Sequence, residues 1–167
     1  MKPLQQGDLD SLCSVYAVLN LINLNLGKKI DAPQASPIFD LILARIHAAQ
    51  GGDLLKIISD GWEPEFLPSI FYFAKRGFEQ VGSLEPVEDL KLTEKCLVYF
   101  ESCTFSHYTI VETIDEGEAS KRLKLFDSFG FDEAIQTGDT YKFQENTRFD
   151  DWCEENMKVL RVWKIAV

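Results

Sequence analysis

Residues 10–26 constrain the fold most, because apolar side chains cover nearly the whole circumference of the helix that they predict. Asp10 or Ser11 can cap the amino end of this helix, and Gly27 can adopt the left-handed conformation just past its carboxyl end. The apolar positions are Leu12, Val15, Tyr16, Val18, Leu19, Leu21, Ile22, Leu24 and Leu26. A helix that is apolar on nearly every side has to be buried on most of them. We therefore predict a central helix around which the rest of the chain packs.

Two more helical patterns follow, and the hydrophobic period then changes from 3.6 to 2. The helical patterns cover residues 36–50, where His47 is predicted to lie on the surface, and residues 65–75. The predicted strands are 96–101, 107–114, 122–126 and 159–167, and a short helix is predicted over 149–156 before the last strand. Helices first and an antiparallel meander afterwards indicate an α+β fold, with the helices packed on one face of a sheet.

Length and charge narrow the classes of function. The 167 residues fit one domain at roughly 150 residues per domain, and the 46% hydrophobic content is sufficient for a real core. The chain has 17 Lys plus Arg against 27 Asp plus Glu, a net charge of −10. Nucleic-acid binding depends largely on cationic contacts to phosphates, so a DNA or RNA partner is disfavoured. Basic or neutral partners are expected instead, and the acidic surface could steer a basic peptide toward the protein.

The chain shows neither a membrane-spanning pattern nor a metal-binding pattern. No apolar run approaches the roughly 20 residues that cross a bilayer, and no secretory signal pattern is visible, so a cytoplasmic protein without a membrane partner is expected. The four cysteines are scattered, with no CxxC motif and no His-spaced cluster, which disfavours both zinc and a disulfide framework. We interpret Cys96, Cys103 and Cys153 as buried or incidental thiols.

Cys13 is the cysteine with a candidate chemical role, because it falls in the first turn of the predicted central helix. The positive end of the helix dipole favours the thiolate there, and the thiolate is the nucleophilic form of cysteine. On its own, the position favours the interpretation of Cys13 as a small apolar side chain at the start of a helix. A partner elsewhere in the sequence is needed to favour catalysis.

A predicted hairpin supplies such a partner. Its two strands flank the polar connection 115–120, and the register that pairs Glu112 with Arg122 also keeps aromatic opposite aromatic and aliphatic opposite aliphatic. The same register places His107 opposite Asp127. A slip of one residue would move the two side chains to opposite faces of the sheet, so the pairing predicts a His–Asp couple.

These residues fit the roles of a catalytic triad. Asp127 would accept one ring N–H of His107, and the other ring nitrogen would take the proton of Cys13. An amide donor for the developing oxyanion could come from Gln6, or from Gln5. The alternatives are a half-exposed histidine at the end of a strand, a turn-forming aspartate and solvated glutamines.

The order of these residues resembles the papain-like cysteine peptidase superfamily, and within it the C39-type bacteriocin-leader peptidases and their stand-alone relatives. A Gln precedes a Cys that opens a buried helix, a His begins one strand, and an Asp ends the next. The resemblance implies one papain-like domain over residues 1–167. It also implies hydrolysis of a peptide or isopeptide bond through an acyl-enzyme, with Cys13, His107, Asp127 and Gln6 in the site and no cofactor.

Two other classes of function remain open from the sequence. Arylamine acetyltransferases and transglutaminases share the ordered Cys, His and Asp, so an acyltransferase on the same triad is one alternative. A binding module that keeps the papain-like fold without turnover is the other.

Overall fold

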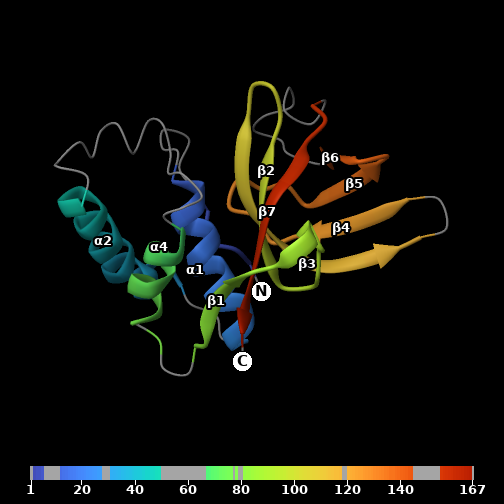
Figure 1. Cartoon of the computed structure of the whole chain (residues 1–167). Helices are drawn as coiled ribbons and strands as arrows, with labels where there is room; N and C mark the ends of the chain where they lie inside the picture. The colour runs from blue at the N-terminus through green and yellow to red at the C-terminus, as the bar shows by residue number, and fades with distance from the viewer. Residues whose placement is uncertain are drawn as a thin grey trace.

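The structure is a computed structural model that describes residues 2–5, 12–27, 31–49, 67–76, 78, 81–117, 120–144 and 155–166. Its helices are α1 (Cys13–Leu26), α2 (Ala32–Ala49), α4 (Leu67–Lys75) and the short 3₁₀ helix η2 (Glu88–Leu90). Its strands are β1 (Ser83–Pro86), β2 (Cys96–Glu101), β3 (Ser106–Glu116), β4 (Lys121–Leu125), β5 (Glu133–Thr137), β6 (Thr140–Gln144) and β7 (Lys158–Ala166). The predicted α+β class is confirmed, and Figure 1 shows the three α-helices gathered on one side of the sheet.

The helix α1 is the central element, as its all-round apolar pattern predicts. Ten of its 14 residues are buried, and Gly27 ends it with a left-handed φ of 63°. Figure 1 shows α1 between the strands and the two outer α-helices. It begins at Cys13, after Leu12 in the capping position and without a side-chain cap. The predicted caps Asp10 and Ser11 lie outside the described residues.

The other two predicted α-helices are present as α2 and α4, and α2 differs from its predicted bounds at its amino end. The helix α2 begins at Ala32, about one turn before the predicted start, because Asp31 and Gln34 cap it reciprocally. The backbone N–H of Gln34 donates to Asp31 Oδ1 at 3.0 Å, and the N–H of Asp31 donates to Gln34 Oε1 at 3.3 Å. His47 is exposed on α2, as predicted. The helix α4 is described from Leu67 and ends at Lys75, as predicted, and residues 65 and 66 of the predicted helix lie outside the described residues.

The sheet has seven strands in the order β1-β7-β2-β3-β4-β5-β6, and all of these pairings are antiparallel. The four predicted strands are present as β2, β3, β4 and β7, with ends that differ by at most two residues. The strands β1, β5 and β6 were not predicted. Glu155 and Asn156 are not helical, and the rest of the short helix predicted over 149–156 lies outside the described residues.

The sheet curls into a partly closed barrel. Tyr141 on β6 and Met157, just before β7, exchange two backbone hydrogen bonds of 2.8 Å, so the last strand of the sheet order returns toward the second. One face of the sheet packs on the helices and forms the helix-side core, which includes Tyr108 and Ile110. The other face forms the barrel core, which includes Val111. Alternate residues of β3 therefore serve two different cores.

None of the helices in the described ranges is long and apolar enough to cross a membrane.

Candidate active site

His107 and Asp127 form a buried pair at one end of the β3–β4 hairpin. His107 is the second residue of β3, and Asp127 follows the end of β4 by two residues. His107 Nε2 lies 2.6 Å from Asp127 Oδ2, and both side chains are 0% exposed. The predicted contact between imidazole and carboxylate is therefore confirmed, and the half-exposed strand-end histidine is excluded.

The register that led to this prediction is nevertheless wrong. Arg122 lies opposite Asp115 rather than Glu112, and Val111 lies opposite Leu125. A β-bulge between Val111 and Thr113 shifts the register, and Glu112 is the extra residue in it. Opposite charges still meet in the observed register, so charge pairing alone could not select between the two.

The predicted register is wrong but still gives the correct contact between His107 and Asp127. On their side of the bulge, the observed register differs from the predicted one by two residues. A shift of two keeps every side chain on its original face of the sheet, whereas a shift of one would reverse the faces. The observed ladder continues past Val111, since the N–H of Phe126 donates to the carbonyl of Ile110 at 2.9 Å. Asp127 is the next residue of the chain, and its side chain turns to the barrel face.

Asp127 serves the local turn and His107 with different oxygen atoms. Its Oδ1 accepts hydrogen bonds from the backbone N–H groups of Phe129, Gly130 and Phe131, at 2.7, 3.0 and 3.3 Å. Gly130 has a φ of +94°, which favours glycine, and this lets the chain fold back over the carboxylate. Oδ2 is left for the imidazole. The turn-forming aspartate and the histidine partner are thus the same residue in the same conformation.

Four phenylalanine rings fix the position of the His107 ring within the barrel core. Phe105 stacks on it with ring centroids 5.6 Å apart and an interplanar angle of 18°. Phe129, Phe131 and Phe143 meet it at steep angles, with centroids 5.3, 5.8 and 6.2 Å away. These contacts restrict rotation of the imidazole, and the rings offer no polar group that competes with Asp127 for it.

The electrostatics of the pair favour the charged forms of both groups. Burial by itself would lower the pKa of His107, but Asp127 and the thiol of Cys13 outweigh it and raise the pKa to about 10. Burial by itself would raise the pKa of Asp127, but the charge and hydrogen bond of His107, together with Thr109 and the N–H of Phe129, lower it. The two residues therefore form an imidazolium–carboxylate pair at neutral pH.

Cys13 approaches the histidine from the helical side of the molecule. Its side chain is partly buried at the first residue of α1, and its thiol is one of the groups that raise the pKa of His107. Asp127 occupies Nε2, so Nδ1 is the nitrogen left for the thiol. Within the described residues Nδ1 is buried and makes no hydrogen bond of standard geometry. The structure thus brings Cys13, His107 and Asp127 together, with the imidazole of His107 between the thiol and the carboxylate.

Of the two glutamines predicted as candidate oxyanion donors, the structure describes Gln5. Gln6, the predicted oxyanion donor, lies outside the described residues. Gln5 is described, and its Nε2 donates to the backbone carbonyl of Asp127 at 3.3 Å. The alternative donor therefore lies beside the turn that carries Asp127.

Asn20 is a contributor that the sequence analysis missed. It is 0% exposed within α1, where its Oδ1 accepts from the N–H of Leu4 at 2.7 Å and its Nδ2 donates to the carbonyl of Leu4 at 3.1 Å. Both bonds anchor the backbone next to Gln5. A polar amide on a helix that is apolar on nearly every side was the available signal, because buried amides need partners.

The other two cysteines that the structure describes, Cys96 and Cys103, offer no comparable arrangement. Cys96 is buried, and burial raises the pKa of its thiol, while Cys103 is exposed. Cys153 lies outside the described residues. In the part of the chain that the structure describes, no group of three or more His, Cys, Asp or Glu residues is placed to hold a metal ion.

Comparison with known proteins finds no match to this chain among protein-family models, curated proteins or solved structures. The interpretation of the site therefore depends on the geometry of Cys13, His107 and Asp127.

Proposed function

We propose that this protein is a cysteine peptidase with a papain-like fold, related to the C39-type peptidases, and that it hydrolyses a peptide or isopeptide bond. The observation that carries the proposal is the buried His107–Asp127 pair, whose remaining ring nitrogen is left for Cys13 at the start of α1. A histidine held by a carboxylate on one side, with a thiol on the other, is the arrangement that activates a cysteine nucleophile.

In the first half of the reaction, the Cys13 thiolate attacks the carbonyl carbon of the substrate and forms a tetrahedral intermediate. His107 then gives its Nδ1 proton to the leaving amine as the C–N bond breaks, and a thioester with Cys13 remains. Asp127 holds the ring through Nε2 throughout these steps. The raised pKa of His107 supports its role here, because the imidazolium is available to protonate the amine at neutral pH.

In the second half, water attacks the thioester and His107 accepts a proton from it. The C–S bond breaks, the acid product leaves, and the thiolate and imidazolium are restored. The oxyanion in both halves requires hydrogen-bond donors. The first intrahelical bond of α1 runs from the N–H of Val15 to the carbonyl of Leu12 at 2.9 Å, so the N–H groups of Cys13 and Ser14 precede it and suit this task. Gln6, or Gln5 after its amide leaves the Asp127 carbonyl, would add a side-chain donor.

The proposal is tested first by the reactivity of the thiols. Treatment with iodoacetamide near neutral pH, followed by intact-mass and peptide mass analysis, should label Cys13 well before Cys96, Cys103 and Cys153. Cys103 is the internal control, because it is exposed and has none of the surroundings of Cys13. Uniform labelling, or no labelling of Cys13, would contradict the proposal and favour an inert binding module.

Turnover is tested with a mixture of peptides analysed by mass spectrometry, with and without a primary amine such as hydroxylamine or glycine methyl ester. Hydrolysis products that require Cys13 support a peptidase. Products in which the acyl group has passed to the added amine, without hydrolysis, would instead assign an acyltransferase on the same triad.

A further inference from the structure

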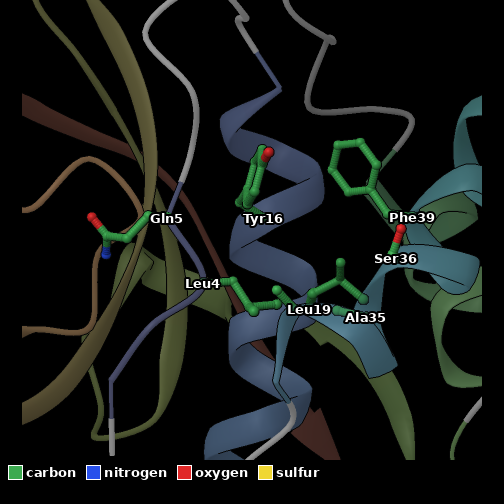
Figure 2. Close-up of a pocket in the computed structure, with 8 residues that line it drawn as sticks. Leu4, Gln5, Tyr16, Leu19, Ala35, Ser36 and Phe39 are labelled. Atoms are coloured by element: carbon green, nitrogen blue, oxygen red, sulfur yellow. The ribbon is translucent and has the colours of Figure 1, made fainter.

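A pocket of about 220 Å³ lies between residues 4–5, α1 and α2. Figure 2 shows Leu4 and Gln5 on one side of it, Tyr16 on α1, and Ala35 and Phe39 from α2 on the other side. Sites for drug-sized ligands have volumes of roughly 300–1,000 Å³. This pocket is smaller, and its size suits one amino-acid side chain.

Among the residues that the structure describes, the lining of the pocket is mainly apolar and carries no charged side chain. The rings of Tyr16 and Phe39 meet with centroids 5.1 Å apart and form an aromatic wall. Gln5 and Ser36 contribute polar groups, and both residues are exposed. Burying an unpaired charge in such surroundings carries a large desolvation penalty, so the pocket selects an uncharged occupant.

Two residues of the pocket lining, Tyr16 and Gln5, connect the pocket to the candidate active site. Tyr16 is three residues beyond Cys13 on α1, and residues at this spacing are neighbours on a helix surface. Gln5 lines the pocket and also donates a hydrogen bond to the backbone carbonyl of Asp127. When a peptide is bound at Cys13, one of the peptide's side chains can therefore reach into the pocket.

The wall made by residues 4–5 is held in place before any ligand arrives. The buried Asn20 fixes both the N–H and the carbonyl of Leu4, at 2.7 and 3.1 Å. Because the wall is already ordered, binding there does not have to order it, which favours affinity.

We propose that this pocket is a substrate subsite that holds one apolar, uncharged side chain of the peptide attacked by Cys13, of the size of leucine or phenylalanine. The inference rests on the proposed peptidase function and adds a specificity to it.

The test uses acetyl-tetrapeptide chloromethyl ketones in which one position at a time is Leu, Phe, Ala, Asp or Lys. The rate of Cys13 alkylation is measured for each probe and divided by the rate with iodoacetamide for the same variant. At the position that enters the pocket, Leu and Phe probes should react roughly 10- to 200-fold faster than Ala, Asp or Lys probes.

The variant Ala35→Leu fills the pocket from α2, and we expect it to abolish the preference for Leu and Phe. The matched control is Ala44→Leu, the same change at an exposed position of α2 outside the pocket, which should keep the preference. Ser36→Phe, at an exposed position on the lining, is the second variant if Ala35→Leu does not fold by circular dichroism.

Two negative results have different meanings. If iodoacetamide labels Cys13 selectively but no position prefers Leu or Phe, or if the filled variants keep that preference, the subsite is refuted and the peptidase proposal stands. If Cys13 is not labelled selectively at all, the peptidase proposal fails and the subsite fails with it.

Discussion

The two halves of the candidate site are built in different ways. On the strand side, His107 and Asp127 are completely buried, 2.6 Å apart, and held by three backbone N–H groups and four phenylalanine rings. On the helix side, Cys13 is partly exposed at the first residue of α1, which has no side-chain cap. The His107–Asp127 pair is therefore part of a folded core, whereas Cys13 lies at its border.

Under the proposed function, this difference separates a residue needed only for catalysis from residues needed for catalysis and for stability. The strand-side groups would contribute to both, because their charges and hydrogen bonds are buried together. The helix-side thiol would contribute to the proposed chemistry and little to the fold. Each of the following predictions tests that separation, and they are ordered from the largest expected effect to the smallest.

The variant Cys13→Ala should lose at least about 10⁴-fold in peptide hydrolysis, because the nucleophile is absent. Its free energy of unfolding should stay within about 0.5–1 kcal/mol of the wild type, since a partly exposed thiol contributes little packing. Hydrolysis rates and urea unfolding monitored by circular dichroism measure the two effects. Cys103→Ala is the control and should change neither. Full activity of Cys13→Ala would remove the mechanism.

The variant Asp127→Ala should lose activity and also about 3–5 kcal/mol of unfolding free energy. It leaves the buried imidazole without its counter-charge and three backbone N–H groups without their acceptor. Asp127→Asn keeps an oxygen acceptor for the turn and should lose less stability than Asp127→Ala. Equal and small losses in both variants would show that the strand side is not the stable half.

The contribution of the pair to stability should depend on pH, with a sign that follows from both pKa shifts. The pKa of His107 is raised from 6.5 to about 10, so its contribution is complete below pH 6.5 and is lost as the pH rises toward about 10. The pKa of Asp127 is lowered from 3.8, so its contribution is complete above that value and is lost as the pH falls through the native pKa. The difference in unfolding free energy between wild type and Asp127→Asn, measured by urea titration from pH 4 to 10, should therefore be largest below pH 6.5. A difference that grows toward pH 10 would contradict the assignment.

The smallest effect tests the register that positions the strand-side pair. Lys124 Nζ lies 2.9 Å from Glu112 Oε2, and the Lys124 side chain is 66% exposed. A double-mutant cycle with Glu112→Gln and Lys124→Met should give a coupling of about 0.2–1 kcal/mol, as is usual for exposed ion pairs. The same cycle with Arg122→Met in place of Lys124→Met should give none. A coupling to Arg122 instead would favour the unbulged register.

Local patterns in the sequence were sufficient for the parts of the fold that depend on one segment. The all-round apolar pattern and Gly27 determine α1, and the period of two determines β2, β3, β4 and β7. The early start of α2 was also visible in principle, because Asp31 and Gln34 have the spacing of a capping box. The five-residue strands β5 and β6 mix polar and apolar residues, so they become recognisable only when Phe143 packs in the barrel core.

The candidate site was predictable as a set of residues but not as a geometry. Chain order and residue type singled out Cys13, His107 and Asp127. The bulge at Glu112 was not predictable, because two registers satisfy the charges on β3 and β4 equally well. The phenylalanine rings around His107 come from three separate segments, and such long-range packing leaves no local pattern in one sequence.

Asp127 both holds a turn and contacts His107, and this has a consequence for how a protein with the proposed activity could lose that activity during evolution. A descendant retained only for binding can replace Cys13 freely, but replacing Asp127 would unravel the turn that closes over it. An inactive copy should therefore be recognised by a substituted cysteine beside an intact histidine and aspartate. Genes that have lost the carboxylate as well should also show compensating changes in the turn at residues 128–131.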